Sequence, residues 1–217
     1  MTPVNGVLSP DFKAIHVDGD RAVSPLLLLH KTGGDENELL PLGRSVGAGR
    51  CLMSVRGQVD EAGRHRFFRR FAQGVFDEDD IRDRADNLAG FVVTERMRLG
   101  LPEPVALGIS NGANMAAALL FRHPTLLAGA ILLRPTSPFS RPPEVDLDGL
   151  PVLVVAGLDD ATVPAADTDR LAADLAQCGA SVLRSSCTAG HRLCEEDTEL
   201  AKRWLISFDA RSRDLNP

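Results

Sequence analysis

The sequence predicts an α/β fold in which a mostly parallel, twisted sheet is covered by helices on both faces. Short apolar runs alternate along the chain with longer amphipathic stretches, which is the pattern of strands joined by crossover helices. The 217 residues suit one domain, and no linker or internal repeat divides them, so we expect a single domain over residues 1–217. A hydrophobic fraction of 44% and a charged fraction of 25% are ordinary for a globular protein.

Strands are predicted where short β-rich runs are bounded by proline, glycine or charged residues. In chain order these runs are 12–17, which suits a sheet edge, and then 26–30, 51–55, 105–109, 130–133, 152–156 and 182–186. Helical periodicity fills most of the intervals, at about 36–44, 79–99, 110–122, 165–177 and 195–208. Three of these helices are ended by Gly100, Pro124 and Gly179.

Residues 56–78 fit neither period, and a stretch of this length in a compact domain is typical of a functional loop. The segment contains Phe67, Phe68, Phe71 and Phe76, which favours a folded structure over disorder. Because it leaves the carboxyl end of a strand, we expect it to form one wall of a substrate pocket. The alternative is that its phenylalanines only fasten it to the core and its arginines are solvated.

The strongest chemical signal is the segment GISNG at residues 108–112, a G-x-S-x-G pattern between a predicted strand and an Ala-rich helix. This context is the one in which glycines allow a strained turn that lifts a serine hydroxyl clear of the sheet. We therefore predict that Ser110 is a nucleophile. A serine at a helix start also commonly caps the helix, and one residue can have both roles.

A serine nucleophile needs an imidazole base that is oriented by a carboxylate, and in this type of site the chain order is serine, acid, histidine. Asp160 follows the strand at 152–156 and His191 follows the last strand, so both are expected at the carboxyl edge of the sheet. Asp159 is the adjacent alternative; Asp160 is favoured because it opens the turn that leads to Pro164. The other histidines do not follow a late strand; they are His16, His30, His65 and His123.

Acyl transfer also needs backbone N–H donors for the developing oxyanion. One is expected from Asn111, directly after the nucleophile. The other is assigned to Thr32, in the glycine-containing turn after the strand at 26–30. Gly33 and Gly34 have a plainer interpretation as a simple connection from strand to helix.

The composition argues against several other classes of function. A net charge of −6 disfavours electrostatic binding of nucleic acid, and no apolar run reaches the roughly 18 residues needed for membrane insertion. The cysteines lack metal-ligand spacing and the Gly33-Gly34 turn lacks a phosphate-loop pattern, so no metal and no cofactor are expected. Without a signal-peptide pattern or a disulfide framework, a cytoplasmic location is expected. A Cys187–Cys194 disulfide is the sterically conceivable alternative.

Taken together, the motifs resemble the phospholipase/carboxylesterase branch of the α/β-hydrolases, near small bacterial carboxylesterases associated with quinone and aromatic-compound detoxification. The resemblance covers nearly the whole chain, through LLH at 28–30, GGDENEL at 33–39, RFFRR at 66–70, GISNGAN at 108–114, RP at 134–135 and GH at 190–191. It implies a Ser110–Asp160–His191 triad, an eight-stranded fold without a large cap, and frequently a homodimer. Lys31 departs from the pattern, because the family usually has glycine after the strand-end histidine.

The predicted function is hydrolysis of small carboxylic esters through an acyl-enzyme intermediate. The short connection over residues 135–150 leaves no room for a large cap, which favours an open cleft. Candidate pocket residues are His30, Arg56, Phe68 and Arg134, with Arg66 and Arg69 as further candidates for an anionic part of the substrate. An acyl-protein thioesterase or lysophospholipase-like hydrolase is an alternative within the class. A non-catalytic ligand-binding protein on the same fold is the alternative from another class.

Overall fold

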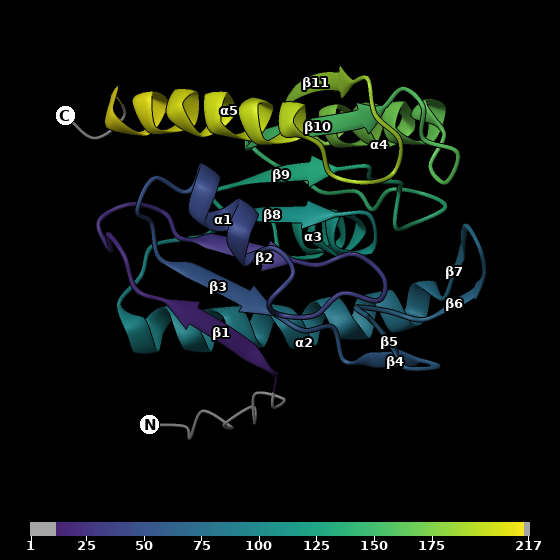
Figure 1. Ribbon diagram of the computed structural model, residues 1–217, viewed down its shortest axis with the longest axis horizontal. Helices are drawn as coiled ribbons and strands as arrows, with labels where there is room; N and C mark the ends of the chain where they lie inside the picture. The colour runs from purple at the N-terminus through teal and green to yellow at the C-terminus, as the bar shows by residue number, and fades with distance from the viewer. Residues whose placement is uncertain (1–11, 215–217) are drawn as a thin grey trace.

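The computed structural model describes residues 12–214, which fold around a seven-stranded central sheet (Figure 1). Across the sheet the strands are β1 (Ala14–Val17), β3 (Leu52–Val55), β2 (Leu26–Leu29), β8 (Val105–Ile109), β9 (Gly129–Leu133), β10 (Pro151–Gly157) and β11 (Ser181–Cys187). The edge strand β1 is antiparallel to β3, and the other neighbouring pairs are parallel. The predicted fold class is confirmed. The resemblance implied eight strands, whereas the described residues contribute seven to this sheet.

Helices cover both faces of the sheet, as Figure 1 shows. In that view α1 (Leu40–Val46) and α5 (Glu195–Asp214) lie in front of the sheet. Behind it lie α2 (Glu78–Leu99), α3 (Asn111–Arg122) and α4 (Ala165–Gln177). Each group of helices packs on its own hydrophobic cluster, so the sheet separates two cores.

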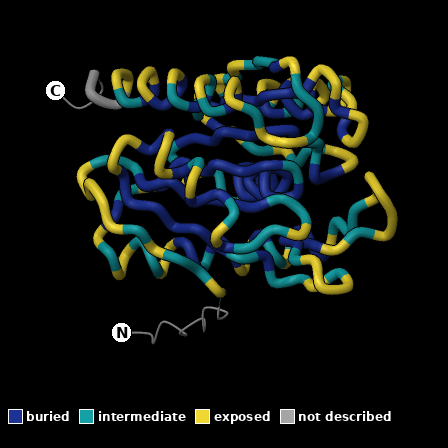
Figure 2. Tube along the Cα trace, viewed as in Figure 1, coloured by how far each residue is buried: buried dark blue, intermediate teal, exposed yellow. Residues whose placement is uncertain are grey.

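Strand β2 shows why the central strands have continuous apolar runs in their amino-acid sequence. All four of its residues are leucines with no exposed surface. Because successive side chains point to opposite faces, Leu27 and Leu29 enter one core while Leu26 and Leu28 enter the other. Each leucine buried in this way stabilises the fold by roughly 1.5–3 kcal/mol before entropy is counted. Figure 2 shows the central strands and α3 as the buried interior of the molecule.

Residues 56–78 form two small hairpins, which corrects the expectation of a segment without strands. The first pairs β4 (Val59–Glu61) with β5 (Arg64–Arg66), and the second pairs β6 (Arg70–Ala72) with β7 (Val75–Phe76). The first turn has positive φ at both central residues, 53° at Ala62 and 80° at Gly63, as tight hairpin turns require. An Ala-Gly pair is a weak signal for such a turn, because alanine adopts positive φ only at a cost.

The other boundaries differ from the prediction by a few residues, with two larger shifts. Helix α1 begins at Leu40 rather than near residue 36, because a turn occupies 36–39 and Pro41 stands in the first helical turn. Helix α5 continues to Asp214, past the predicted end at 208. No helix within residues 12–214 combines the length and apolarity that crossing a membrane would need.

Candidate active site

Ser110 stands on a sharp turn between β8 and α3, with φ 52° and ψ −116°. Positive φ at a non-glycine residue is strained, and such strain is typical of functional turns. The turn is possible only with glycines on both sides. A Cβ on Gly108 would lie 2.6 Å from the carbonyl oxygen of Gly112, and one on Gly112 would lie 2.0 Å from that of Leu29. Close packing of α3 on the sheet therefore explains the two glycines of the motif.

Ser110, His191 and Asp160 are hydrogen-bonded in series. The Ser110 Oγ lies 2.9 Å from His191 Nε2, and His191 Nδ1 lies 2.8 Å from Asp160 Oδ2. Ser110 follows β8, Asp160 follows β10 and His191 follows β11, so three loops at the carboxyl edge of the sheet supply the three side chains. The structure thus brings together the three residues on which the sequence prediction centred.

Asp160 is held as a carboxylate by the turn that follows it. Its side chain has no exposed surface, and its Oδ1 accepts hydrogen bonds from the N–H groups of Thr162 and Val163 at 2.7 and 2.9 Å. Burial alone would raise the pKa of Asp160. The bonds from Val163, His191 and Thr162 outweigh burial, so the pKa lies below its ordinary value of 3.8. The neighbouring Asp159 is exposed, and its N–H donates to the Ala189 carbonyl.

The two residues assigned to the oxyanion site both border the same cleft. Among residues 12–214, the backbone N–H groups of Thr32 and Asn111 have no hydrogen-bond partner. The Thr32 hydroxyl accepts a bond of 2.8 Å from Arg66 Nη1, and Asn111 Oδ1 accepts one of 2.7 Å from the Phe67 N–H. Both turns are therefore tied to the hairpin segment.

The backbone of Lys31 does not have a positive φ. In this turn only Gly33 does. The residue that departs from the family pattern thus introduces no backbone strain. Its ammonium pairs with Glu38, and its N–H donates to Glu38 Oε2 at 3.2 Å. Burial, together with the charge of Arg192, lowers the pKa of Lys31.

The cleft has a volume of about 720 Å³ and opens beside Ser110 and His191. Both hairpins border it, because Arg64, Arg66 and residues 73–76 are among its lining residues. The segment 56–78 therefore forms a wall of the cleft, but through polar and basic side chains more than through its phenylalanines. Phe67 and Phe68 are buried in the core, whereas Phe76 borders the cleft.

The four main pocket candidates lie away from the cleft, and each has another role. Of the two further candidates, Arg66 borders the cleft, whereas Arg69 does not and donates to Asp77 Oδ2 at 3.0 Å. Phe68 is fully buried. Arg56 donates to both oxygens of Glu36, at 2.8 Å from Nη2 to Oε1 and by a second bond from Nε. His30 is 1% exposed; its Nε2 accepts from the Gly57 N–H at 2.9 Å, which leaves Nδ1 to donate to the Lys31 carbonyl at 2.7 Å. The histidine thus fixes the Lys31 turn.

Arg134, the fourth, is fully buried beneath the loop that carries His191. It forms an ion pair with Asp197, with bonds of 2.5 and 2.9 Å, and its Nε donates to the Gly190 carbonyl at 3.1 Å. Sequence reasoning missed Asp197, because an acidic residue in the first turn of a helix looks like an ordinary dipole partner. A buried arginine needs such a partner, and the motif RP gives no indication of it.

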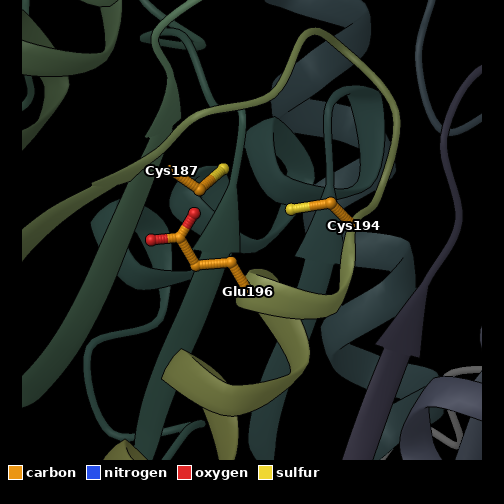
Figure 3. A group of neighbouring side chains, drawn as sticks. All are labelled: Cys187, Cys194 and Glu196. Atoms are coloured by element: carbon orange, nitrogen blue, oxygen red, sulfur yellow. The ribbon is translucent and has the colours of Figure 1, made fainter.

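Within residues 12–214, one group of three potential metal-binding side chains has its ligand atoms within 4.8 Å of one another. It consists of Cys187, Cys194 and Glu196 (Figure 3). All four cysteines are free. Metal binding needs thiolates, but burial and the nearby Asp197 raise the pKa of Cys187 to about 12. The Arg134 guanidinium also lies 2.9 Å from Cys187 Sγ, and its charge repels a cation. The surroundings are those of a packed thiol.

A mostly parallel, doubly covered sheet with a strained serine turn and a histidine at its carboxyl edge defines the α/β-hydrolase class of enzymes. No protein-family model matches the chain. The chain is 40% identical over 181 residues to the putative hydrolase MhqD of Bacillus subtilis. The aligned region covers 82% of this chain and 90% of that protein.

Two solved structures extend the comparison. The Bacillus cereus carboxylesterase superposes with a TM-score of 0.89 and 37% identity, covering 92% of this chain and 95% of the other. The Mesorhizobium loti carboxylesterase gives a TM-score of 0.86 and 30% identity, covering 94% and 98%. The chain therefore belongs to the carboxylesterase branch of the α/β-hydrolase family and is a hydrolase.

Proposed function

We propose that the chain is a serine carboxylesterase that hydrolyses small carboxylic esters through an acyl-enzyme intermediate. The observation that carries the proposal is the unbroken series of hydrogen bonds from Ser110 through His191 to the buried carboxylate of Asp160. A serine hydroxyl is a weak nucleophile, and this arrangement activates it by providing a base in the correct orientation.

In the first half of the reaction, Ser110 Oγ attacks the ester carbonyl while His191 Nε2 takes the hydroxyl proton. The Asp160 carboxylate stabilises the imidazolium through Nδ1, and the N–H groups of Thr32 and Asn111 receive the developing oxyanion. Each such donor typically lowers the barrier by about 3 kcal/mol. Collapse of the tetrahedral intermediate releases the alcohol, which takes the proton from His191.

In the second half, water attacks the acyl-enzyme by the same route. His191 removes one proton from the water, a second tetrahedral intermediate forms, and Ser110 leaves with that proton as the carboxylic acid departs. The cleft favours small or surface-presented esters, because residues 135–150 contain no helix that could cover it. The nucleophile, the base, the acid and the oxyanion donors of this mechanism are all groups of this chain.

The test is Ser110→Ala, measured with p-nitrophenyl butyrate and with a fluorophosphonate probe that labels activated serines. We expect labelling to disappear and turnover to fall by about 10⁴-fold or more. Ser207→Ala is the matched control, because Ser207 is an exposed serine on α5 whose hydroxyl donates only to the Arg203 carbonyl. Labelling that persists in Ser110→Ala, or a wild-type chain that neither labels nor turns over, would refute the proposal.

A further inference from the structure

The cleft carries a charge opposite in sign to that of the whole chain. The full sequence has a net charge of −6. The residues that border the cleft nevertheless include six basic ones against two acidic ones, Glu78 and Asp167; the basic ones are Lys31, Arg64, Arg66, Arg70, Arg170 and Arg192. A concave site lined by one sign of charge raises the local concentration of oppositely charged ligands.

Three of the basic residues are arginines whose guanidinium groups are bonded to other groups in the walls of the cleft. Arg70 donates to both oxygens of Glu61, at 2.9 and 2.7 Å. Arg66 is buried and donates to Thr32 and to a backbone carbonyl. Arg170 donates to the Ser140 carbonyl and lies 3.9 Å from Asp174. These arginines brace the walls of the cleft.

The remaining three lie around the turn that holds one oxyanion donor. Arg64 and Arg192 are exposed, and neither forms an ion pair with any residue in the described part of the chain. Arg64 covers the turn, because a Cβ on Gly33 would lie 3.4 Å from its Nε. Arg192 directly follows His191. It is also near enough to Lys31 for its charge to act on that ammonium, which has Glu38 as its only ion-pair partner among residues 12–214.

Like charges gathered in this way repel one another, and a negatively charged ligand relieves the repulsion. Resting on the function proposed above, we propose that the enzyme selects esters that carry a negatively charged group, and that Lys31, Arg64 and Arg192 bind this group at the mouth of the cleft. Ser110 lies in the same cleft, so an ester can present its carbonyl to the serine while its anionic end remains near solvent. The three side chains come from separate segments, so the selectivity depends on the folded cleft.

The test compares matched esters that differ in charge. One pair is the mono-p-nitrophenyl ester of adipic acid, with a free carboxylate, and the same compound with that carboxylate methylated. A second pair places the charge on the leaving group, as butyrate esters of p-hydroxyphenylacetic acid and of its methyl ester. We expect kcat/KM to be roughly 10-fold higher for the anionic member of at least one pair at low salt, and the preference to shrink as salt screens the charges.

The readout for the residues is the ratio of kcat/KM between the two members of a pair, because general damage to the site affects both members. Arg192→Gln and Arg64→Gln should each lower that ratio by about 3-fold, and the double variant by more. Arg203→Gln, an exposed arginine on α5, should leave the ratio unchanged. Equal rates within both pairs at low salt, or an unchanged ratio in the double variant, would overturn the inference while leaving the esterase proposal intact. Failure of the esterase proposal is distinguishable, because no ester would then be hydrolysed.

Discussion

One wall of the cleft comes from loops at the ends of the central strands, and another comes from two hairpins attached outside the sheet. The triad wall holds Ser110 and Asp160 at the ends of the buried strands β8 and β10, and His191 after the partly exposed edge strand β11. The hairpin wall, residues 59–76, pairs only with itself in two short ladders. It is fastened to the rest of the protein by the burial of Phe67 and Phe68 in the core and by hydrogen bonds such as those from Phe67 N–H to Asn111 and from Arg66 to Thr32.

This difference separates two tasks of the site. The reacting groups need fixed geometry, and the strand ends provide it because the sheet cannot shift without disrupting both cores. The hairpin wall contributes charge and shape toward the substrate, where less precision is required. We therefore expect changes to the triad wall to alter turnover or global stability strongly, and changes to the exposed side chains around the hairpin wall to have smaller effects.

The largest effect is expected from the acid of the triad wall. Asp160→Asn keeps the size of the side chain but replaces the acceptor for His191 Nδ1, so the imidazole loses its orientation and turnover should fall by about 10³–10⁴-fold. Asp159→Asn is the matched control, because Asp159 is exposed and the structure places only its backbone in a hydrogen bond. The measurement is the kcat of both variants and of the wild type in steady-state hydrolysis of an ester. A larger loss in Asp159→Asn would move the acid to that residue.

The next effect tests whether the triad wall depends on buried charge. Arg134→Met should destabilise the fold by about 3–5 kcal/mol, because it leaves the Asp197 carboxylate buried without its cation. The measurement is the free energy of unfolding in urea. Adding Asp197→Leu should recover part of that stability, since the uncompensated charge is then gone. Arg203→Met, on the exposed face of α5, should change stability by less than about 0.5 kcal/mol. A single variant as stable as wild type would show that the buried pair has no such role.

The same contrast explains what could be predicted from the sequence. Ser110 and Asp160 follow apolar runs whose buried strands are evident from composition, and His191 follows the last predicted strand, so their meeting at one sheet edge could be inferred. The roles of His30 and Arg134 could not, because a polar residue beside a strand looks the same whether it faces a ligand or a buried partner. Their partners, Gly57 and Asp197, are 27 and 63 residues away in the chain.

The hairpin wall was unpredictable for a local reason. Its strands are two or three residues long, too short to establish an alternating pattern, and its first turn uses Ala62-Gly63. The basic lining of the cleft was also hidden, because the arginines of this wall, Lys31 and Arg192 are brought together only by the fold. Sequence alone placed arginines near the site without distinguishing those that are paired from those that are not.

A smaller, pH-dependent effect is expected from His30, whose ring packs against Phe67 of the hairpin wall. Burial lowers the pKa of His30 from 6.5, and the neutral ring accepts the Gly57 N–H. The unfolded chain therefore binds a proton more readily than the folded one. The stabilisation is full above about pH 6.5 and is lost as the pH falls below that value, by at most about 1.4 kcal/mol per pH unit. In His30→Gln, unfolding free energies measured from pH 7 to about pH 5.5 should show a shallower decline. Equal slopes would contradict the assignment.

The smallest effect concerns the backbone of the turn beneath the hairpin wall. Lys31 occupies the family's usual glycine position without positive φ, so glycine brings no relief of strain there. Lys31→Gly should instead lower stability by about 0.4–1 kcal/mol, because glycine gives the unfolded chain more freedom. Lys31→Ala is the matched control, since it also removes the ion pair with Glu38 but retains a Cβ. Thermal unfolding should therefore rank the alanine variant above the glycine variant. The reverse order would show that lysine strains the turn, and that the geometry of the Thr32 N–H had been adjusted to accommodate it.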